Sequence, residues 1–260
     1  MNILTDHLKE LLDKDIRLDG RRLDEYREIK IEKGISSKSA EGSAKVTIGN
    51  TTVIAGVKLE MAKPYPDMPD KGTMMVGVEL LPLSSPDFES GPPSIQSIEL
   101  ARAGIDRGIR ESGSIDFKKL CLVEGEKVWN VLIDVYSFDD NGNLFDALGL
   151  AAAAALQDAR FPKYDEENDK VLYEERTSKG LPLKEIPVTI TILKIKDKFI
   201  VDPTNEEEEA ADARLTISSL EDGRICAMQK GGEEALSPSD ISKMIDISFK
   251  KSKELRKLLK

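Results

Sequence analysis

Histidine is almost absent from this chain, which has a single one, His7, among 260 residues. Ser-His-Asp and Cys-His catalysis and histidine-rich zinc sites therefore have only His7 to use, and we place it on the solvated side of an N-terminal helix. Cysteine is scarce too. Cys121 and Cys226 lie far apart, each in an apolar segment. This favours two buried free thiols over a disulfide or a metal-binding pair.

Net positive charge is also lacking. The chain has 48 Asp and Glu residues against 38 Lys and Arg residues, a formal net charge of −10 at pH 7. It therefore cannot hold nucleic acid through its overall electric field, and any such contact must be local. The apolar run 147–156 is too short to cross a bilayer, and the N-terminal leucines alternate with acidic residues, unlike a signal peptide. We expect an intracellular, cytoplasmic protein with no membrane contact and no cofactor.

The order of strand and helix patterns predicts an α+β fold, with helices packed on largely antiparallel sheets. Two β-rich runs flank Gly49-Asn50, which is typical of a hairpin turn. Helices are expected at 1–14, 95–111 and 147–156, and a last one capped by Ser239. Strands are expected at 42–48, 51–59, 74–83, 119–123, 127–138, 188–195, 198–201, 215–219 and 225–229.

Two charged segments read as solvent-facing connections. Residues 164–183 are polar and show no periodicity, so we expect a long irregular link there. From its residues alone, the segment 16–27 is expected to be a solvated loop. The expected organisation is an N-terminal helix (1–15), the first half of the domain (16–165), the connection (166–187), and the second half with the C-terminal helix (188–260).

The helix expected at 95–111 carries three arginines. Arg107 and Arg110 are one turn apart and share a face. Arg102 and Arg107 are five residues apart and would not align on a regular α-helix, but a one-residue π-bulge near Gly104 would bring them closer. In so acidic a chain the cluster suggests a phosphate-backbone contact. The residues alone favour an alternative, in which the arginines pair with nearby acidic side chains: Glu99, Asp106 and Glu111.

A polar turn with a glycine, residues 140–143, leads into the apolar helix. Such a turn at a helix N-terminus is a place where backbone N–H groups and the helix dipole can hold a phosphate. Further along, Glu206 to Glu209 and Asp212 form an acidic cluster. Consecutive glutamates more often solvate a loop, and a metal site is the alternative.

Several short stretches, taken together and in this order, resemble the RNase PH family over nearly the whole chain. They are Arg17-Leu18-Asp19-Gly20-Arg21, the hairpin 42–53, Ile98-Glu99-Leu100-Ala101-Arg102, Gln157-Asp158-Ala159, and Val201-Asp202-Pro203-Thr204 with Asp212-Ala213-Arg214. The resemblance implies an RNase PH-like fold. It also implies a reaction in which phosphate attacks the 3′-terminal phosphodiester of RNA and releases nucleoside diphosphates.

The phosphate site that the resemblance implies is degenerate in this sequence. Active family members carry Gly-Thr-Arg or Gly-Ser-Arg at the turn before the buried helix, where this chain has Asn143, Leu144 and Phe145. The arginine pair that active members carry before Ile-Glu-Leu falls at Ile95 and Gln96. Asp212 matches the position of the family's catalytic aspartate. Without the phosphate cradle we interpret it as a relic or a structural hydrogen-bond acceptor, and we expect no catalytic residue in this chain.

Within the family, the chain is most similar to the non-catalytic RNase PH-type subunits of archaeal exosomes. These alternate with a catalytic subunit in a six-membered ring that acts on single-stranded RNA with RNA-binding cap proteins. The resemblance implies that Arg102, Arg107 and Arg110 contribute to the RNA path. Two alternatives stay open: a self-sufficient phosphate-dependent 3′→5′ exoribonuclease, and a structural subunit with no RNA contact.

Overall fold

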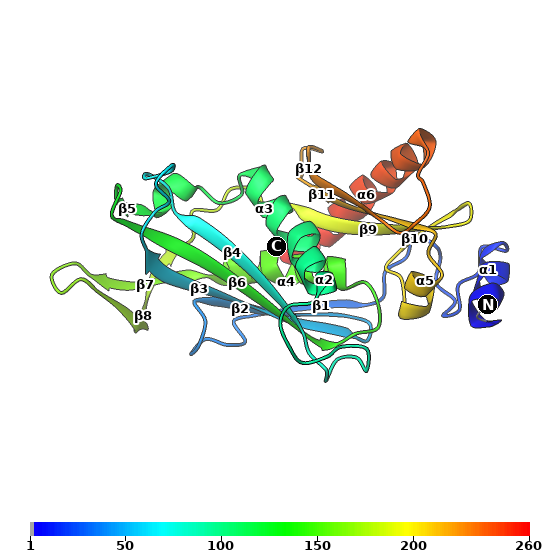
Figure 1. Ribbon diagram of the computed structural model, residues 1–260, viewed down its shortest axis with the longest axis horizontal. Coiled ribbons are helices and arrows are strands. Elements are labelled where there is room, and N and C mark those ends of the chain that lie inside the picture. The colour runs from blue at the N-terminus through cyan, green and yellow to red at the C-terminus, as the bar shows by residue number, and fades with distance from the viewer. Residues whose placement is uncertain (1–2) are drawn as a thin grey trace.

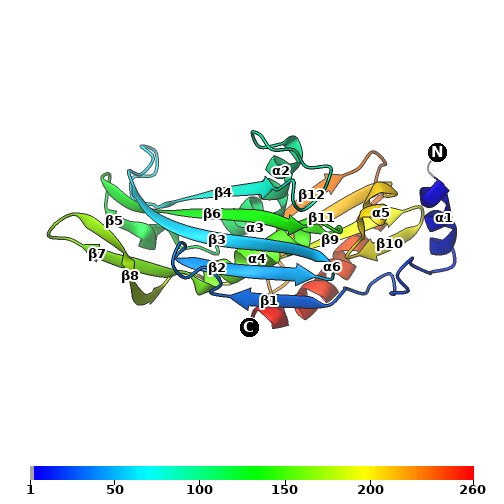
Figure 2. The ribbon, with the colours of Figure 1, turned by 90° about the horizontal axis from the view of Figure 1, so that it is seen from below.

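Two sheets enclose a central helix, α4 (Leu144–Asp158), in the computed structural model, which describes residues 3–260 (Figures 1 and 2). The larger sheet has the order β1-β2-β3-β6-β4, with β5 paired to β6, and the smaller one has the order β10-β9-β11-β12. Strand β4 runs parallel to β6, while the other pairs within these two sheets are antiparallel. The α+β class expected from the sequence is confirmed.

The larger sheet is built from the N-terminal half of the chain. Its strands are β1 (Ile29–Lys33), β2 (Gly42–Ile48), β3 (Thr51–Ala62), β4 (Thr73–Leu80), β5 (Cys121–Val123) and β6 (Lys127–Asp139). A 3₁₀ turn, η2 (Phe117–Leu120), precedes β5. The hairpin between β2 and β3 turns at Gly49-Asn50 as predicted, and Gly49 has a φ of +56°, a conformation that favours glycine.

The smaller sheet comes from the C-terminal half, and one face of it is covered by α6 (Pro238–Leu259). Its strands are β9 (Val188–Ile195), β10 (Lys198–Val201), β11 (Ala213–Ser219) and β12 (Ile225–Gly231). Ser237, not Ser239, caps α6. Its hydroxyl accepts the N–H of Asp240, and the Asp240 carboxylate accepts the N–H of Ser237. This reciprocal pair requires a carboxylate three residues after the capping serine. Asp240 stands at that distance from Ser237, but no carboxylate does so from Ser239.

Small side chains let other elements approach α4 closely. A Cβ atom added at Gly42 of β2 would lie 2.3 Å from the Ala155 carbonyl oxygen, and one at Gly149 would lie 3.2 Å from the Thr189 Cβ on β9. The alanines of α4 are buried on all sides, as the sequence predicts. Although α4 is apolar, none of the helices within residues 3–260 is long and apolar enough to span a membrane.

The helix predicted at 95–111 is three segments in one continuous run (Figure 1): α2 (Ile95–Glu99), the π-helix η1 (Leu100–Asp106) and α3 (Arg107–Ser112). A π-bulge near Gly104 was only a possibility in the sequence, and the structure has a π-helix there that extends over seven residues. The run packs against α4 and β4 on one side and against β12 on the other.

The polar segment 164–183 is not the irregular link expected from the sequence. It contains most of a two-stranded ribbon, β7 (Arg160–Asp165) and β8 (Lys170–Gly180), which extends from one end of the molecule (Figure 1). Most side chains of β8 are at least partly exposed, so the strand buries no continuous face and shows no period-two pattern. Cross-strand contacts such as Lys163–Glu175 (2.7 Å) accompany the backbone pairing.

The N-terminal helix α1 (Ile3–Leu12) lies at the opposite end of the molecule from β7–β8 (Figure 1). Leu8 and Leu12 are buried in a small cluster with residues of the second half, while His7 is exposed as predicted. Cys121 and Cys226 are free, as expected, but each is only partly buried.

Candidate nucleic-acid interface

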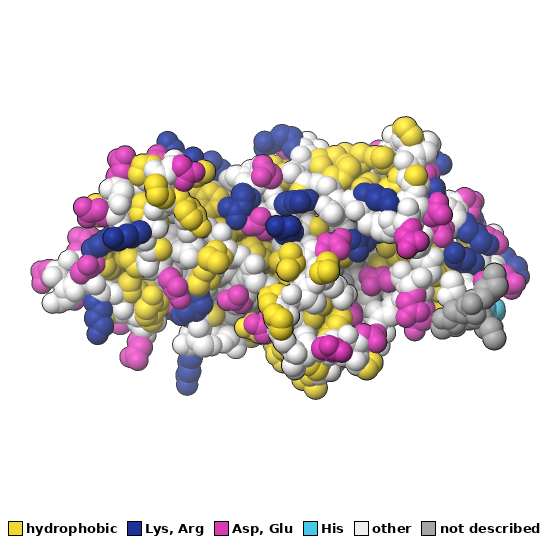
Figure 3. Space-filling view, in the orientation of Figure 1, with side chains coloured by type: hydrophobic (Ala, Val, Ile, Leu, Met, Phe, Trp, Pro, Cys, Tyr) yellow, Lys and Arg dark blue, Asp and Glu magenta, His cyan; other side chains and the backbone are white. Residues whose placement is uncertain are grey.

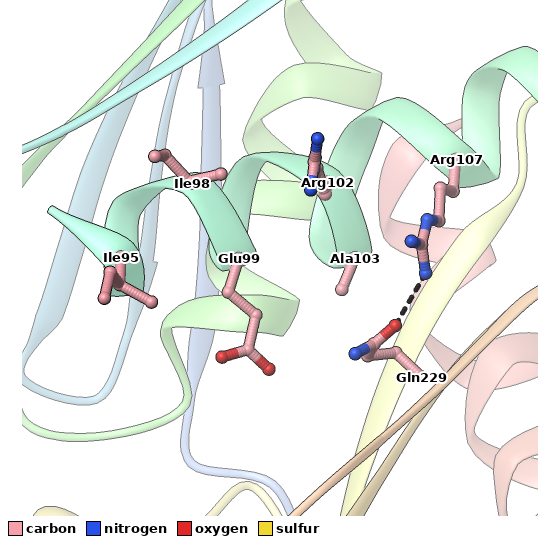
Figure 4. Close-up of a pocket in the computed structure, with 7 residues that line it drawn as sticks. All are labelled: Ile95, Ile98, Glu99, Arg102, Ala103, Arg107 and Gln229. Carbon is pink, nitrogen blue, oxygen red and sulfur yellow. Dashed lines mark hydrogen bonds between the residues drawn. The ribbon is translucent and has the colours of Figure 1, made fainter. Parts of the chain in front are cut away.

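Arg102 and Arg107 line one surface pocket of ≈ 230 Å³. Its other lining residues come from the same helical run and from β12: Ile95, Ile98, Glu99, Ala103 and Gln229 (Figure 4). The π-helix places the two arginines together, because the N–H of Arg107 donates to the carbonyl of Arg102 five residues earlier. The five-residue spacing that would separate them on a regular α-helix therefore becomes one turn.

Arg110 lies outside this pocket. Its Nη2 donates to Asp106 (2.6 Å) and to the Met74 carbonyl on β4 (3.2 Å), and this bond to Asp106 raises the pKa of Arg110. The pairing with nearby acids that the sequence allowed thus holds for Arg110 with Asp106. In contrast, no carboxylate within residues 3–260 pairs with Arg102 or Arg107, both of which are exposed. The structure brings together Arg102 and Arg107 but sets Arg110 apart.

Basic side chains gather locally even though the chain is acidic. Figure 3 shows several Lys and Arg side chains over the region of α3 and the adjoining ends of β11 and β12, with few acidic groups between them. Basic side chains thus lie close together on a chain whose formal net charge is −10. This fits the expectation that any nucleic-acid contact is local.

Arg214 on β11 is a further charged group next to the pocket residue Glu99, and no role for it was expected from the sequence. Its Nη2 donates to Glu99 (2.5 Å), and its guanidinium lies 4.0 Å from the centre of the Phe145 ring. Phe145, on α4, stands where active family members carry an arginine. Here the guanidinium of Arg214 from strand β11 covers the ring, but it is neutralised by Glu99. In the sequence, Arg214 stood out only as the last residue of the Asp-Ala-Arg stretch that carries part of the family resemblance.

The turn before α4 has the shape of an anion site but not its chemistry. Asn143 is in the left-handed conformation, with a φ of +63°, and its backbone N–H donates to Glu208 Oε1 (2.9 Å). Leu144 and Phe145 are buried and offer neither hydroxyl nor guanidinium. A carboxylate of the chain itself therefore occupies the N–H group that a phosphate would use.

Asp202, which sequence reasoning missed as a site residue, organises the groups around that turn. Its buried carboxylate accepts hydrogen bonds from Arg21 (2.7 Å), Arg27 (2.7 Å) and the Asn143 amide (2.9 Å). Burial alone would raise the pKa of Asp202, but the hydrogen bonds and charge of Arg27, with the charge of Arg21, lower it. The charges of Arg21 and Arg27 are thus already paired, since Asp202 contacts both and Asp19 also contacts Arg21 (2.6 Å).

The segment 16–27 is not the solvated loop expected from its residues. Arg17 is 2% exposed and forms a forked pair with Glu207, with Nε to Oε1 at 2.8 Å and Nη2 to Oε2 at 2.5 Å. Glu207 belongs to a short helix, α5 (Asn205–Glu209), which also contains Glu208. Glu207 and Glu208 therefore have partners within the chain, whereas Glu209 is exposed to solvent as expected. Among the described residues, no group of three acidic, histidine or cysteine side chains could hold a metal ion.

Asp212 is engaged by neighbouring groups of the same chain. One carboxylate oxygen accepts from Lys9 Nζ on α1 (3.1 Å), and the other accepts the backbone N–H of Lys196 in the turn between β9 and β10. Both oxygens therefore have partners that tie the N-terminal helix to the smaller sheet. The contacts are those of a structural acceptor.

Asp146, in the first turn of α4, is a buried acid that the sequence did not single out. Burial raises its pKa to about 7, against the lowering effect of the Tyr26 hydroxyl, which donates to Oδ2 (2.6 Å). Asp146 Oδ1 and Asn143 Oδ1 are both buried without a partner. A proton on Asp146 adds a donor among these acceptors, so the neutral form suits the site.

We expect Asp146→Asn to stabilise the protein at neutral pH but not at pH 4. Folded Asp146 keeps its proton up to about pH 7, whereas the unfolded chain loses it near 3.8. Its contribution is therefore full below about pH 4 and is lost progressively as the pH rises from 4 through the folded pKa near 7, on the order of 4 kcal/mol. Urea unfolding of both proteins between pH 4 and 8 measures the difference. A constant difference across this range would contradict the assignment.

The chain is similar to known proteins over nearly its whole length. Domain 1 of the 3′ exoribonuclease family (RNase PH) matches residues 25–162, and domain 2 matches residues 185–251. The exosome complex component Rrp42 of Thermococcus gammatolerans is 46% identical over 259 residues, which cover 99% of this chain and 94% of that protein.

Two solved structures are similar throughout. A chain of the Archaeoglobus fulgidus exosome with RNA bound to the active site has a TM-score of 0.91 and 43% identity, with 99% of this chain and 98% of that chain covered. A chain of an archaeal exosome core has a TM-score of 0.86 and 40% identity, with coverage of 99% and 96%. The RNase PH-like fold expected from the sequence is confirmed.

Proposed function

The chain belongs to the 3′ exoribonuclease family, RNase PH, and we propose that it is a non-catalytic, RNA-contacting subunit of an archaeal exosome. In this proposal it acts in the cytoplasm, in a phosphorolytic 3′→5′ exoribonuclease ring that degrades and processes RNA. Its partners are a catalytic RNase PH-type subunit, with which it alternates in a hetero-hexamer, RNA-binding cap proteins and single-stranded RNA. Two of the similar structures are exosomes, one of them with RNA bound to the active site.

The turn before α4 carries the proposal that this subunit is inactive. Phosphorolysis needs positive groups and N–H donors that hold inorganic phosphate next to the scissile bond. Here the N–H of Asn143 is bonded to Glu208, and the arginines nearby are paired with Asp202. Phosphate would meet the apolar side chains of Leu144 and Phe145 in place of charge-assisted donors.

The pocket between η1 and β12 supports the proposed RNA contact. Arg102 and Arg107 are exposed guanidinium groups without a carboxylate partner in residues 3–260. Such groups can bind a phosphate without first breaking an ion pair. The chemistry then takes place in the partner subunit, while these arginines hold the RNA backbone that leads to it. Arg110 has to leave Asp106 to do the same.

The rival function is a self-sufficient phosphorolytic exoribonuclease. It requires a phosphate cradle and a carboxylate close to the scissile bond, and Asp212 is the family's position for that carboxylate. Because both oxygens of Asp212 are bonded to Lys9 and Lys196, the observed contacts favour the non-catalytic role. Residues 140–145 themselves carry no hydroxyl and no guanidinium that could substitute for the missing cradle.

We expect Asp212→Ala to leave the rate of phosphate-dependent RNA degradation by the reassembled ring within about twofold of wild type. A catalytic acid–base group contributes about 10²–10⁴-fold, and a structural acceptor at the edge of a subunit contributes nothing to the chemical step. The matched control is the aspartate at the same family position in the catalytic partner, whose removal should abolish the activity. A large loss with this chain's Asp212→Ala, in a ring that still assembles, would favour the rival function.

A further inference from the structure

The guanidinium of Arg107 is held by Gln229 across the pocket. Arg107 Nη1 donates to Gln229 Oε1 at 2.6 Å, from the start of α3 to strand β12 (Figure 4). We propose that Gln229 is a positioning residue, which orients Arg107 toward RNA phosphate while leaving its charge intact. The inference rests on the proposed function and adds a second element, β12, to the RNA contact.

A neutral acceptor has a different effect from a carboxylate. An amide oxygen fixes the direction of a guanidinium group and carries no charge, whereas a carboxylate both fixes and neutralises it. Three other arginines that tie elements of this protein together are paired with carboxylates: Arg17 with Glu207, Arg27 with Asp202 and Arg214 with Glu99. Arg107 is bonded to an amide instead, so its full charge faces solvent.

Both ends of the Arg107–Gln229 contact are fixed by backbone packing. Gln229 pairs with Thr216 in the β11–β12 ladder, which sets its position and the face it occupies. On the helix side, a Cβ added at Gly108 would lie 3.0 Å from Ser218 Oγ, so α3 packs closely against β11 next to Arg107. Side chains alternate along β12, and Met228 and Lys230 therefore point to the opposite face from Gln229.

Fixing Arg107 in advance favours binding because a long arginine side chain loses about 2 kcal/mol of rotamer entropy when it is immobilised. The Gln229 bond restricts that freedom before RNA arrives. The Asp106–Arg110 pair on the same helix restricts a side chain as well, but it also competes with phosphate for the guanidinium. Gln229 thus orders the Arg107 side chain without competing with phosphate for its charge.

The test uses the full ring, reassembled with the catalytic subunit, and a short single-stranded RNA whose affinity is measured at several salt concentrations. We expect Gln229→Ala to weaken RNA binding roughly three- to tenfold with little change in salt slope, because the charge remains. Gln229→Glu keeps the shape and the hydrogen bond but neutralises Arg107. It should therefore weaken binding about as much as Arg107→Ala and lower the salt slope by about 0.7. Met228→Ala, on the other face of β12, should bind as wild type.

The double variant separates positioning from a general effect on the fold. If Gln229 acts through Arg107, Gln229→Ala should have no further effect in an Arg107→Ala ring. An equal loss in both backgrounds, a comparable loss with Met228→Ala, or wild-type affinity and salt slope with Gln229→Glu would overturn the inference. If Arg107→Ala itself left RNA affinity unchanged, the proposed RNA contact would fail, and the positioning role with it.

Discussion

Replacing both Arg102 and Arg107 with glutamate should weaken RNA binding by the assembled ring on the order of 100-fold or more. The two guanidinium groups line one pocket, and the π-helix aligns them. Each phosphate neutralised on a single strand contributes about 0.7 to the salt slope, so losing two contacts should lower it by about 1.4. Affinity measured at several salt concentrations gives both quantities.

Arg110→Glu is the matched control for this experiment. Arg110 is on the same helical run and is also exposed, but it is bonded to Asp106 and lies outside the pocket. Its replacement should change RNA affinity less than fivefold or so, since only a screened charge is altered. If the Arg102 and Arg107 variant bound RNA as tightly as wild type, with an unchanged salt slope, the chain would be a structural subunit without RNA contact.

Arg17→Ala should lower the free energy of unfolding by about 3–5 kcal/mol, the largest stability effect we expect from a single substitution. The substitution leaves Glu207 buried without its partner, and both side chains are almost inaccessible to solvent. Arg17 also donates to the carbonyl oxygens of Val201 and Asp202, which lose a donor as well. Urea unfolding of the isolated chain at neutral pH measures the change.

Arg22→Ala is the control for the ion pair. The Arg22 side chain is 78% exposed and contacts Asp24 and Glu25 at 3.9 and 3.6 Å, so its loss should cost less than about 1 kcal/mol. Two neighbouring arginines of the same charged segment thus differ in expected effect because only one is buried. Similar small losses for Arg17 and Arg22 would show that the Arg17–Glu207 pair is not desolvated in the folded protein.

The sequence predicted those parts of the fold in which local pattern and tertiary packing agree. The Gly49-Asn50 hairpin has both the turn residues and the flanking strands, and the buried helix α4 has a continuous apolar surface. In both cases the information lies within about ten residues of chain. The π-helix was only a possibility in the sequence, since nothing there requires Arg102 and Arg107 to share a face.

The buried arginines could not be predicted in this way. The partners of Arg17 and Arg27 are Glu207 and Asp202, more than 170 residues further along the chain. A charged segment looks solvated until its partners are known, because its burial depends on the pairing and not on its own pattern. The same holds for Arg214, whose role follows from its contacts with Glu99 and Phe145.

The candidate site was predicted in part. Comparison of motifs indicated that Asn143, Leu144 and Phe145 lack the phosphate-binding side chains, and the geometry adds that Glu208 occupies the backbone N–H at the turn. The sequence grouped Arg110 with Arg107 because three residues make nearly one helical turn. The structure separates them, since Arg110 bonds to Asp106 and the β4 backbone while Arg107 reaches β12.

The most direct test is phosphate-dependent release of nucleoside diphosphates from a short single-stranded RNA, measured with this chain alone and then with the chain mixed with a catalytic RNase PH-type subunit. We predict no release by the chain alone, and release by the mixture that requires inorganic phosphate. Phosphate-dependent release by the chain alone, abolished by Asp212→Ala, would contradict the account and identify the chain as an exoribonuclease in its own right.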